Sequence, residues 1–322
     1  MSQPGSAPPV AAASIARRRL GPSRCGTVVT ADADATLAAY RRALDLQLVS
    51  DAPLSAAVAG AWGKPALAGR RLLVLGADAA DPSTHWLRVL EVPGAVAPAP
   101  MRQRGWLALE VLVRDVVALG RRFDADAQGL FRVLGPPRPL SVSDDIWAMQ
   151  VAGPAGETLY LTEVRAPVPP FALPMNASLT AERLFIPVLS APGRDRSLSW
   201  YEALNGHTGL RFDSRVSALN RALGLDPEWR RPVATLQLAQ DSLVEIDQVP
   251  EHGPTPAACA QAEGLPAGLA MVSLFADLDL PLPDGAVWRP CDDSRWPSCS
   301  VALVRGPAGE CVELLGRPHT AP

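Results

Sequence analysis

The chain has 322 residues, a formal charge of −3 and a hydrophobic share of 48%. The length is typical of about two domains, and the apolar share is enough for a sizeable core. The balanced charge gives no basic surface for nucleic acid or an anionic membrane, and no apolar run reaches the ~18 residues of a spanning helix. We therefore expect no nucleic-acid partner and no membrane partner. A homodimer stays open.

Residues 1–22 are rich in proline and small side chains, and their arginines follow the apolar stretch. A secretory signal has the opposite order, so a disordered tail is predicted for residues 1–22. The five cysteines are odd in number and form no CxxC pair. This pattern favours reduced thiols and a cytoplasmic protein.

Two short motifs occur once in each half of the chain. Gly-Pro-Ala-Gly-Glu stands at Gly153–Glu157 and again at Gly306–Glu310, 153 residues later. Asp34–Tyr40 resembles Asp195–Tyr201, at an offset of 161 residues. The similar offsets indicate a tandem duplication. The predicted halves are residues 23–165 and 180–317, joined by a proline-rich linker at 166–179.

Each half is predicted to repeat again as a strand, a helix and further strands. Val28–Asp32 and Leu109–Asp115 open the first two units, and helical patterns follow them at Ala35–Leu44 and Val117–Phe123. The other two opening strands are Leu184–Leu189 and Met271–Asp277. Extended segments complete the four units at 71–75, 86–92, 146–151, 158–163, 233–238, 243–247, 299–304 and 312–315. Four similar units predict a pseudo-symmetric α+β fold.

The opening pattern, a strand ending in Asp before Asp-x-Ser/Thr-x-x-x-Tyr, resembles the βαβββ module of the vicinal oxygen chelate superfamily. The Gly-Pro-Ala-Gly-Glu turn resembles the end of that module. The superfamily includes glyoxalase I, extradiol dioxygenases and bleomycin-binding proteins, and the resemblance covers about Cys25 to Arg317. It implies four βαβββ modules paired into two half-barrel, glyoxalase-like domains. In such domains the cleft holds a metal and the substrate.

The resemblance also implies that the metal-ligand set is largely lost. Family ligands come from the first strand of a module, usually His or Gln, and from its last strand, usually Glu. The first-strand positions here hold Cys25, Ala108, about Ile186 and Ala270. The last-strand positions hold Tyr160, Glu245 and Glu313, with Arg88 or Glu91 in module one. No metal or other cofactor is therefore expected, although carboxylates alone leave weak divalent binding open.

Three of these positions are predicted to be catalytic. Alternation with apolar neighbours places Glu313 in a cleft, where desolvation would make it a general base. The alternative for Glu313 and for Glu245 is an ion pair with an arginine. Tyr160 is expected to donate a hydrogen bond to a substrate oxygen, with core packing as its alternative.

Five further residues are predicted to bind the substrate. Trp62, Trp288 and Trp296 would supply apolar walls, the last two beside a loop that suits a cleft rim. Arg88 would bind an anion, with an ion pair to a neighbouring glutamate as its alternative. His85 begins a strand, and a satisfied imidazole ring is its alternative.

These residues leave three functional hypotheses. The first is a metal-independent or weakly metal-dependent enzyme of lyase or isomerase type, acting on an apolar or aromatic oxygenated small molecule with Glu313 as the base. The second is a binding protein of bleomycin-resistance type that sequesters a small ligand. The third is a ring-cleaving enzyme like the extradiol dioxygenases, which would need two histidines and a carboxylate for Fe(II).

Overall fold

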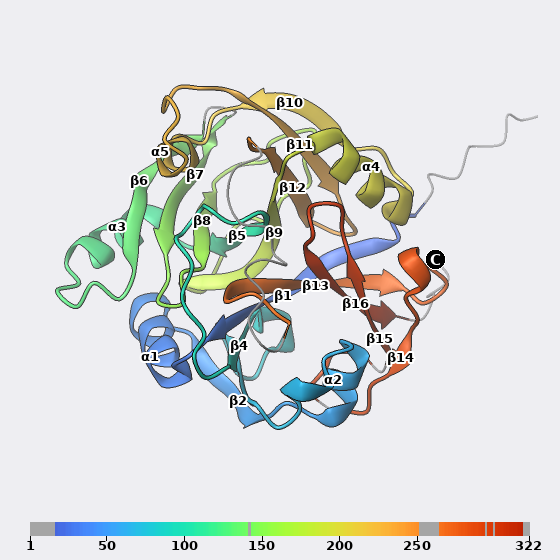
Figure 1. The fold of residues 1–322 in the computed structure, drawn as a ribbon. Coiled ribbons are helices and arrows are strands. Elements are labelled where there is room, and N and C mark those ends of the chain that lie inside the picture. Colours follow the sequence, from blue (N-terminus) through green and yellow to red (C-terminus); the bar gives the residue numbers. More distant parts are fainter. Residues whose placement is uncertain (1–16, 141–142, 251–263, 294, 299, 318–322) are drawn as a thin grey trace, which may run out of the picture.

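The computed structural model describes residues 17–140, 143–250, 264–293, 295–298 and 300–317. These residues form two curved eight-stranded sheets with the helices at the periphery (Figure 1). The mixed α+β fold built from βαβββ modules is confirmed. Among the described residues, no helix combines the length and the apolar character needed to cross a bilayer.

The first half of the chain supplies two modules. Module one contains β1 (Leu20–Thr30), α1 (Ala33–Leu44), β2 (Gln47–Pro53), α2 (Ala56–Ala61), β3 (Arg71–Gly76) and β4 (Leu87–Glu91). Module two contains β5 (Gly105–Val113), α3 (Val116–Asp124), β6 (Arg132–Leu140), β7 (Ser143–Ala152) and β8 (Thr158–Val164).

The second half supplies the other two. Module three contains β9 (Ala181–Ala191), α4 (Arg194–Asn205), β10 (Leu210–Ser214), α5 (Ser217–Ala222), β11 (Arg231–Gln237) and β12 (Leu243–Gln248). Module four contains β13 (Gly268–Asp277), β14 (Arg289–Pro290), β15 (Ser300–Arg305) and β16 (Cys311–Arg317). A short 3-10 turn at Pro283–Gly285 stands where the other modules have a helix, because prolines at 281 and 283 interrupt the segment.

The sheets combine modules from different halves of the chain. One sheet runs β14-β15-β16-β13-β1-β4-β3-β2 and joins module four to module one. The other runs β10-β11-β12-β9-β5-β8-β7-β6 and joins module three to module two. In both, the first strands of two modules meet antiparallel at the centre. Each half-barrel therefore draws on both sequence halves, rather than on two consecutive modules.

The aspartates of the opening motif begin the helices. Asp32 caps α1, where its Oδ1 accepts a hydrogen bond of 2.8 Å from the Ala35 amide. Asp115 caps α3 in the same way through the Ala118 amide, also at 2.8 Å. A side-chain acceptor at this position satisfies one of the free amides of the first turn. These caps fix the point at which each opening strand turns into its helix.

The two repeated motifs meet across module boundaries. Tyr40 of the opening motif donates to Glu157 Oε1 of the closing motif at 2.6 Å. Tyr201 donates to Glu310 Oε1 at 3.1 Å, one repeat later. The second oxygen of each glutamate accepts the amide two residues earlier in its own turn, at 2.9 Å in both cases. The Tyr–Glu bonds thus link module one to two and three to four, while the sheets link one to four and two to three.

The structure describes part of the predicted N-terminal tail and the whole of the predicted linker between the domains. Leu20 is fully buried, and Leu20–Pro22 already belong to β1, so the ordered chain begins before the predicted boundary at residue 22. Residues 1–16 lie outside the described residues. The predicted linker at 166–179 contains no helix or strand, and β9 follows it at Ala181.

Candidate functional site

Strand alternation separates a shared core from two concave faces. On β12, Val244 and Ile246 pack into the core between the sheets, so Glu245 and Asp247 face the concave side. On β5, Leu109 and Val111 pack into the same core and Glu110 faces the concave side. A carboxyl group therefore projects inward from each of these strands of the module 2–3 sheet.

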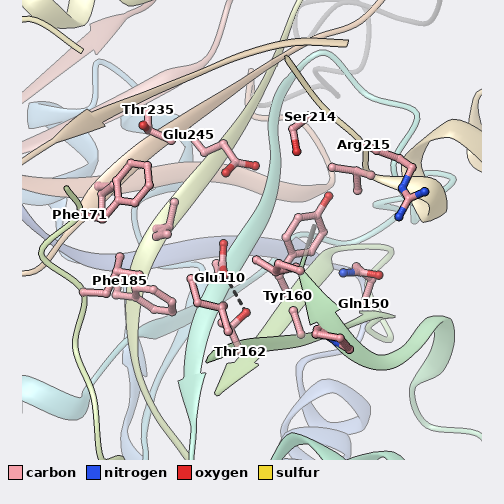
Figure 2. Close-up of a pocket in the computed structure, with 18 of the residues that line it drawn as sticks. Glu110, Gln150, Tyr160, Thr162, Phe171, Phe185, Ser214, Arg215, Thr235 and Glu245 are labelled. Carbon is pink, nitrogen blue, oxygen red and sulfur yellow. Dashed lines mark hydrogen bonds between the residues drawn. The ribbon is translucent and has the colours of Figure 1, made fainter. Parts of the chain in front are cut away.

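A cavity of about 150 Å³ lies on this concave face, and we call it the module 2–3 cavity. Its polar lining includes Glu110, Tyr160 and Glu245, which come from β5, β8 and β12 (Figure 2). Most of the remaining wall is apolar and comes from both modules and the linker: Leu140, Ile146, Ala148, Phe171, Leu173, Phe185, Ile186, Phe212, Val216 and Leu243. Apolar walls with a few convergent polar groups are typical of small-molecule sites.

Glu110 is the carboxyl with the most defined position in this cavity. Thr162 on the neighbouring strand donates a hydrogen bond of 2.7 Å to Glu110 Oε1 (Figure 2). Only 6% of Glu110 is exposed. Burial, together with the negative charge of Asp247, raises the pKa of Glu110 to about 7, against the opposing effect of the Thr162 hydrogen bond. Glu110 is therefore a carboxyl that both gains and loses a proton near neutral pH.

Glu245 and Asp247 are neighbours on the same face of β12. Burial raises the pKa of Glu245 well above its ordinary value, and the charges of Asp247 and Glu110 raise it further. Burial raises the pKa of Asp247 to about 6, where the positive charge of Arg231 limits the rise. Both carboxyls therefore bind their protons more strongly than an exposed carboxyl does.

Several buried polar atoms beside these carboxyls have no hydrogen-bond partner within the described part of the chain. Arg231 and Asp247 are both 0% exposed, and all three guanidinium nitrogens and both carboxylate oxygens are unpartnered. The Tyr160 hydroxyl and Gln150 Oε1 are unpartnered as well. Buried polar atoms in native proteins nearly always have partners, in protein or in water. Such a concentration is therefore expected where a ligand or ordered water is bound.

The concave face of the module 1–4 sheet is filled instead by a cluster around Glu313. Arg88 Nη1 lies 2.5 Å from Glu313 Oε2, and Ser273 donates to the same oxygen. The indole nitrogens of Trp62 and Trp296 donate to Glu313 Oε1 at 2.7 and 2.8 Å. We call these five residues the Glu313 cluster.

The contacts of this cluster bear on the predicted general base. Glu313 is 0% exposed, and each of its oxygens already accepts two hydrogen bonds. Although burial alone would raise its pKa, the Arg88 charge and the hydrogen bonds hold the pKa of Glu313 below its ordinary value. These surroundings are those of a buried ion pair, the alternative to a base, and they leave no carboxylate oxygen for a substrate.

Six of the eight residues predicted as a site fall into two places in the structure. Glu245 and Tyr160 line the module 2–3 cavity. Glu313, Arg88, Trp62 and Trp296 form the Glu313 cluster, in which Arg88 bonds Glu313 and not the neighbouring Glu91.

His85 and Trp288 belong to neither place. The His85 ring contacts the Asp78 carbonyl at 3.1 Å, and Trp288 packs against the shared core.

The residue that sequence reasoning missed is Glu110. The family spacing selected Ala108, two residues earlier on the same face of β5. The pairing of β5 with β9 is irregular between Trp106 and Ala108 and again after Glu110. Counting residues along the strand therefore does not give the position whose side chain faces the cavity. A usable signal was present, because Glu110 is the one charged residue in the nine-residue buried strand Gly105–Val113.

Comparison with solved structures identifies the fold. A mutant of glyoxalase I from Zea mays superposes with a TM-score of 0.59 at 16% identity, covering 91% of this chain and 93% of that chain. The Zea mays glyoxalase I itself gives 0.57 at 15% identity, covering 91% of this chain and 92% of that chain. A putative dioxygenase from Bacillus subtilis gives 0.57 at 15% identity, covering 94% of this chain and 86% of that chain.

The chain has the vicinal oxygen chelate fold. Identities of this size support the fold and carry no activity from those proteins to this one. No protein-family model and no curated protein matches the sequence.

The vicinal oxygen chelate fold implies a divalent metal on the concave face of a half-barrel, and the side chains that the structure describes on the two concave faces do not fit one. In the Glu313 cluster, the guanidinium of Arg88 neutralises the carboxylate that would serve as a ligand. In the module 2–3 cavity, Ile186 supplies an apolar side chain from β9. Among the described residues, no three His, Cys, Asp or Glu side chains are placed to hold a metal ion together.

Proposed function

We propose that the protein is an enzyme of lyase or isomerase type that moves a proton on a small, apolar, oxygenated molecule bound in the module 2–3 cavity. The observation that carries the proposal is Glu110, a buried carboxyl that lines the cavity and has a pKa of about 7. General acid–base catalysis is most efficient when the pKa of the catalytic group is near the working pH. The proposal places the base in module two, at a position other than Glu313.

The roles in this mechanism follow from the protonation states. Glu110 as a carboxylate takes a proton from a carbon or hydroxyl of the substrate, and Thr162 fixes the orientation of the carboxylate. Glu245, whose pKa is raised by burial, donates a hydrogen bond in its protonated form to the substrate oxygen on which negative charge develops, and Glu110 then returns its proton to the substrate. Tyr160 supplies a second donor, since its hydroxyl has no partner within the described residues. Asp247 and Arg231 act on these groups through their charges and do not transfer the proton.

The size of the cavity limits the substrate. A dry cavity of roughly 150 Å³ is known to accommodate one benzene molecule. The module 2–3 cavity has about the same volume, and two of the residues that line it, Pro139 and Arg215, are exposed at the surface. We propose a substrate with one ring, or a chain of similar bulk, that carries a carbonyl or hydroxyl group toward Glu110.

The proposal is tested by proton exchange. Purified protein is incubated in D₂O with a panel of small carbonyl and hydroxy compounds, and NMR follows the loss of each substrate proton signal. We expect exchange or conversion for at least one compound and its loss in Glu110→Gln. Glu313→Gln is the matched comparison, because that variant removes the other candidate base. Exchange that survives Glu110→Gln but disappears in correctly folded Glu313→Gln would contradict the proposal.

A ligand-sequestering protein is the second candidate, and one feature favours it. The linker residues Phe171 and Leu173 line the cavity, so a segment outside both sheets covers part of the site. Gln237 holds this segment through two hydrogen bonds with the Ala172 backbone, of 3.0 and 3.1 Å. In the exchange experiment, saturable binding without exchange, unaltered by Glu110→Gln, would support this candidate instead.

The dioxygenase alternative has no such support. Iron in a ring-cleaving site needs two histidines and a carboxylate. Among the residues that the structure describes, those that line the module 2–3 cavity include no histidine.

A further inference from the structure

Three arginines gather where the module 2–3 cavity meets the surface. Arg138 on β6 and Arg215, which follows β10, both line the cavity. Arg221 on α5 reaches toward the same strand and donates to the Leu134 carbonyl at 3.4 Å. We call Arg138, Arg215 and Arg221 the arginine rim.

The rim carries more positive charge than its neighbours neutralise. Arg215 is paired with Glu228. The half-buried side chain of Arg138 has no hydrogen bond or ion pair within the part of the chain that the structure describes. The pKa of Arg138 is lowered, first by the partial burial of its side chain and then by the positive charges of Arg221 and Arg215. The three guanidinium groups thus repel one another with one carboxylate between them.

This arrangement differs from that of the arginines that are paired with carboxylates elsewhere in the chain. In a chain whose formal charge is −3, arginines such as Arg71, Arg88, Arg122 and Arg211 each bond at least one carboxylate. A guanidinium is a planar donor that matches carboxylate and phosphate oxygens. An arginine that is left without an anion beside a cavity is therefore suited to bind the anion of a ligand.

We propose that the substrate of the module 2–3 cavity is an organic acid whose anionic group binds at the arginine rim, with Arg138 as its principal partner, while its apolar body fills the cavity toward Glu110. This inference rests on the proposed function for the position of the substrate. It goes further in naming the chemical class, a single-ring or similarly sized carboxylate or phosphate. The carboxyl groups of Glu110 and Glu245 inside the cavity and the positive charges of the arginine rim would then fix the orientation in which the molecule binds.

The test compares an acid with its neutral isostere. Isothermal titration calorimetry at low salt measures the binding of 3-phenylpropanoate and of 3-phenylpropanamide, which share shape and differ in charge. A charge-assisted pair predicts that the acid binds about tenfold more tightly than the amide, and that added salt reduces this preference. Benzyl phosphate in a third titration distinguishes a site for phosphate from one for carboxylate.

Variants at two arginines of the same strand locate the effect. Arg138→Gln should remove the preference for the acid and leave the affinity for the amide unchanged. Arg132→Gln is the matched control, because Arg132 is exposed on β6 and does not line the cavity. Equal affinities of wild type for acid and amide, or a preference that persists in an Arg138→Gln/Arg215→Gln variant, would overturn the inference.

The same titrations separate this inference from the proposed function. Glu110→Gln should keep the preference for the acid, because the rim does not need a base. If wild type prefers the acid and Glu110→Gln leaves proton exchange unaltered, the proposed function is wrong and the anion-binding role of the arginine rim is supported. If proton exchange depends on Glu110 and the acid and the amide bind equally, the arginine rim does not bind an anion and the proposed function is supported.

Discussion

Arg88 Nη1 lies 2.5 Å from Glu313 Oε2, with the two side chains 4% and 0% exposed. The guanidinium carbon also lies 4.1 Å from the centre of the Trp296 ring, which itself donates to the other carboxylate oxygen. A buried charge pair of this kind is stable only when both charges are matched and their hydrogen bonds are complete. One of the two concave faces is therefore closed by its own side chains, and the other contains the cavity.

Glu313→Gln should destabilise the fold by about 3–5 kcal/mol, because it leaves the Arg88 charge buried without its partner. Urea denaturation measures the loss. The double variant Arg88→Met/Glu313→Leu should recover much of the stability, since no uncompensated charge remains. A Glu313→Gln protein as stable as wild type would show that the Glu313 cluster does not support the fold.

The free energy of unfolding should fall as pH rises from about 4.5 to about 7. Burial raises the pKa of Glu110 and of Glu310 from 4.5 to about 7. Each carboxyl therefore binds its proton more strongly in the folded state, and this contribution to stability is lost as pH rises through the folded pKa. Urea titrations across this range should show a smaller slope for Glu110→Gln. Asp124→Asn, which changes an exposed carboxyl, should keep the wild-type slope.

Removing one hydroxyl from a Tyr–Glu bond should weaken the contact between consecutive modules. Tyr201→Phe leaves Glu310 Oε1 without its side-chain donor in a buried position, which should cost about 1–3 kcal/mol. Tyr40→Phe should have a similar effect at Glu157. Because the two bonds share no residue, the losses should add in the double variant, as followed by chemical denaturation. A loss in one variant only would mean that the repeats are not equivalent.

Phe171→Ala should weaken the binding of aromatic probes in the module 2–3 cavity and leave the stability of the fold nearly unaltered. Phe171 lies in the linker, lines the cavity and is held over it by the Ala172–Gln237 hydrogen bonds. Loss of its apolar contact should reduce affinity for 3-phenylpropanamide about tenfold. Met175→Ala is a matched control in the same linker, since Met175 is 37% exposed and lies outside the cavity. If Phe171→Ala and Met175→Ala bind 3-phenylpropanamide equally well, Phe171 does not contribute to the binding site.

The sequence alone determined the modular plan because its signals are local. The paired motifs mark where strands end, where helices begin at Asp32 and Asp115, and where the closing turns lie. Alternation of polar and apolar residues was sufficient to place Glu245 on a concave face, because neighbouring positions on a strand point in opposite directions.

Tertiary structure decided which of these inward-facing residues meet. Arg88 and Glu313 are 225 residues apart, and they pair because the sheet joins module one to module four. The sheet that joins module two to module three brings Glu110 and Glu245 to one cavity, and the parallel pairing of β5 with β8 sets Glu110 beside Thr162. Long-range packing of sheets and strand register is set by the burial of whole faces, so it is not readable from any one segment.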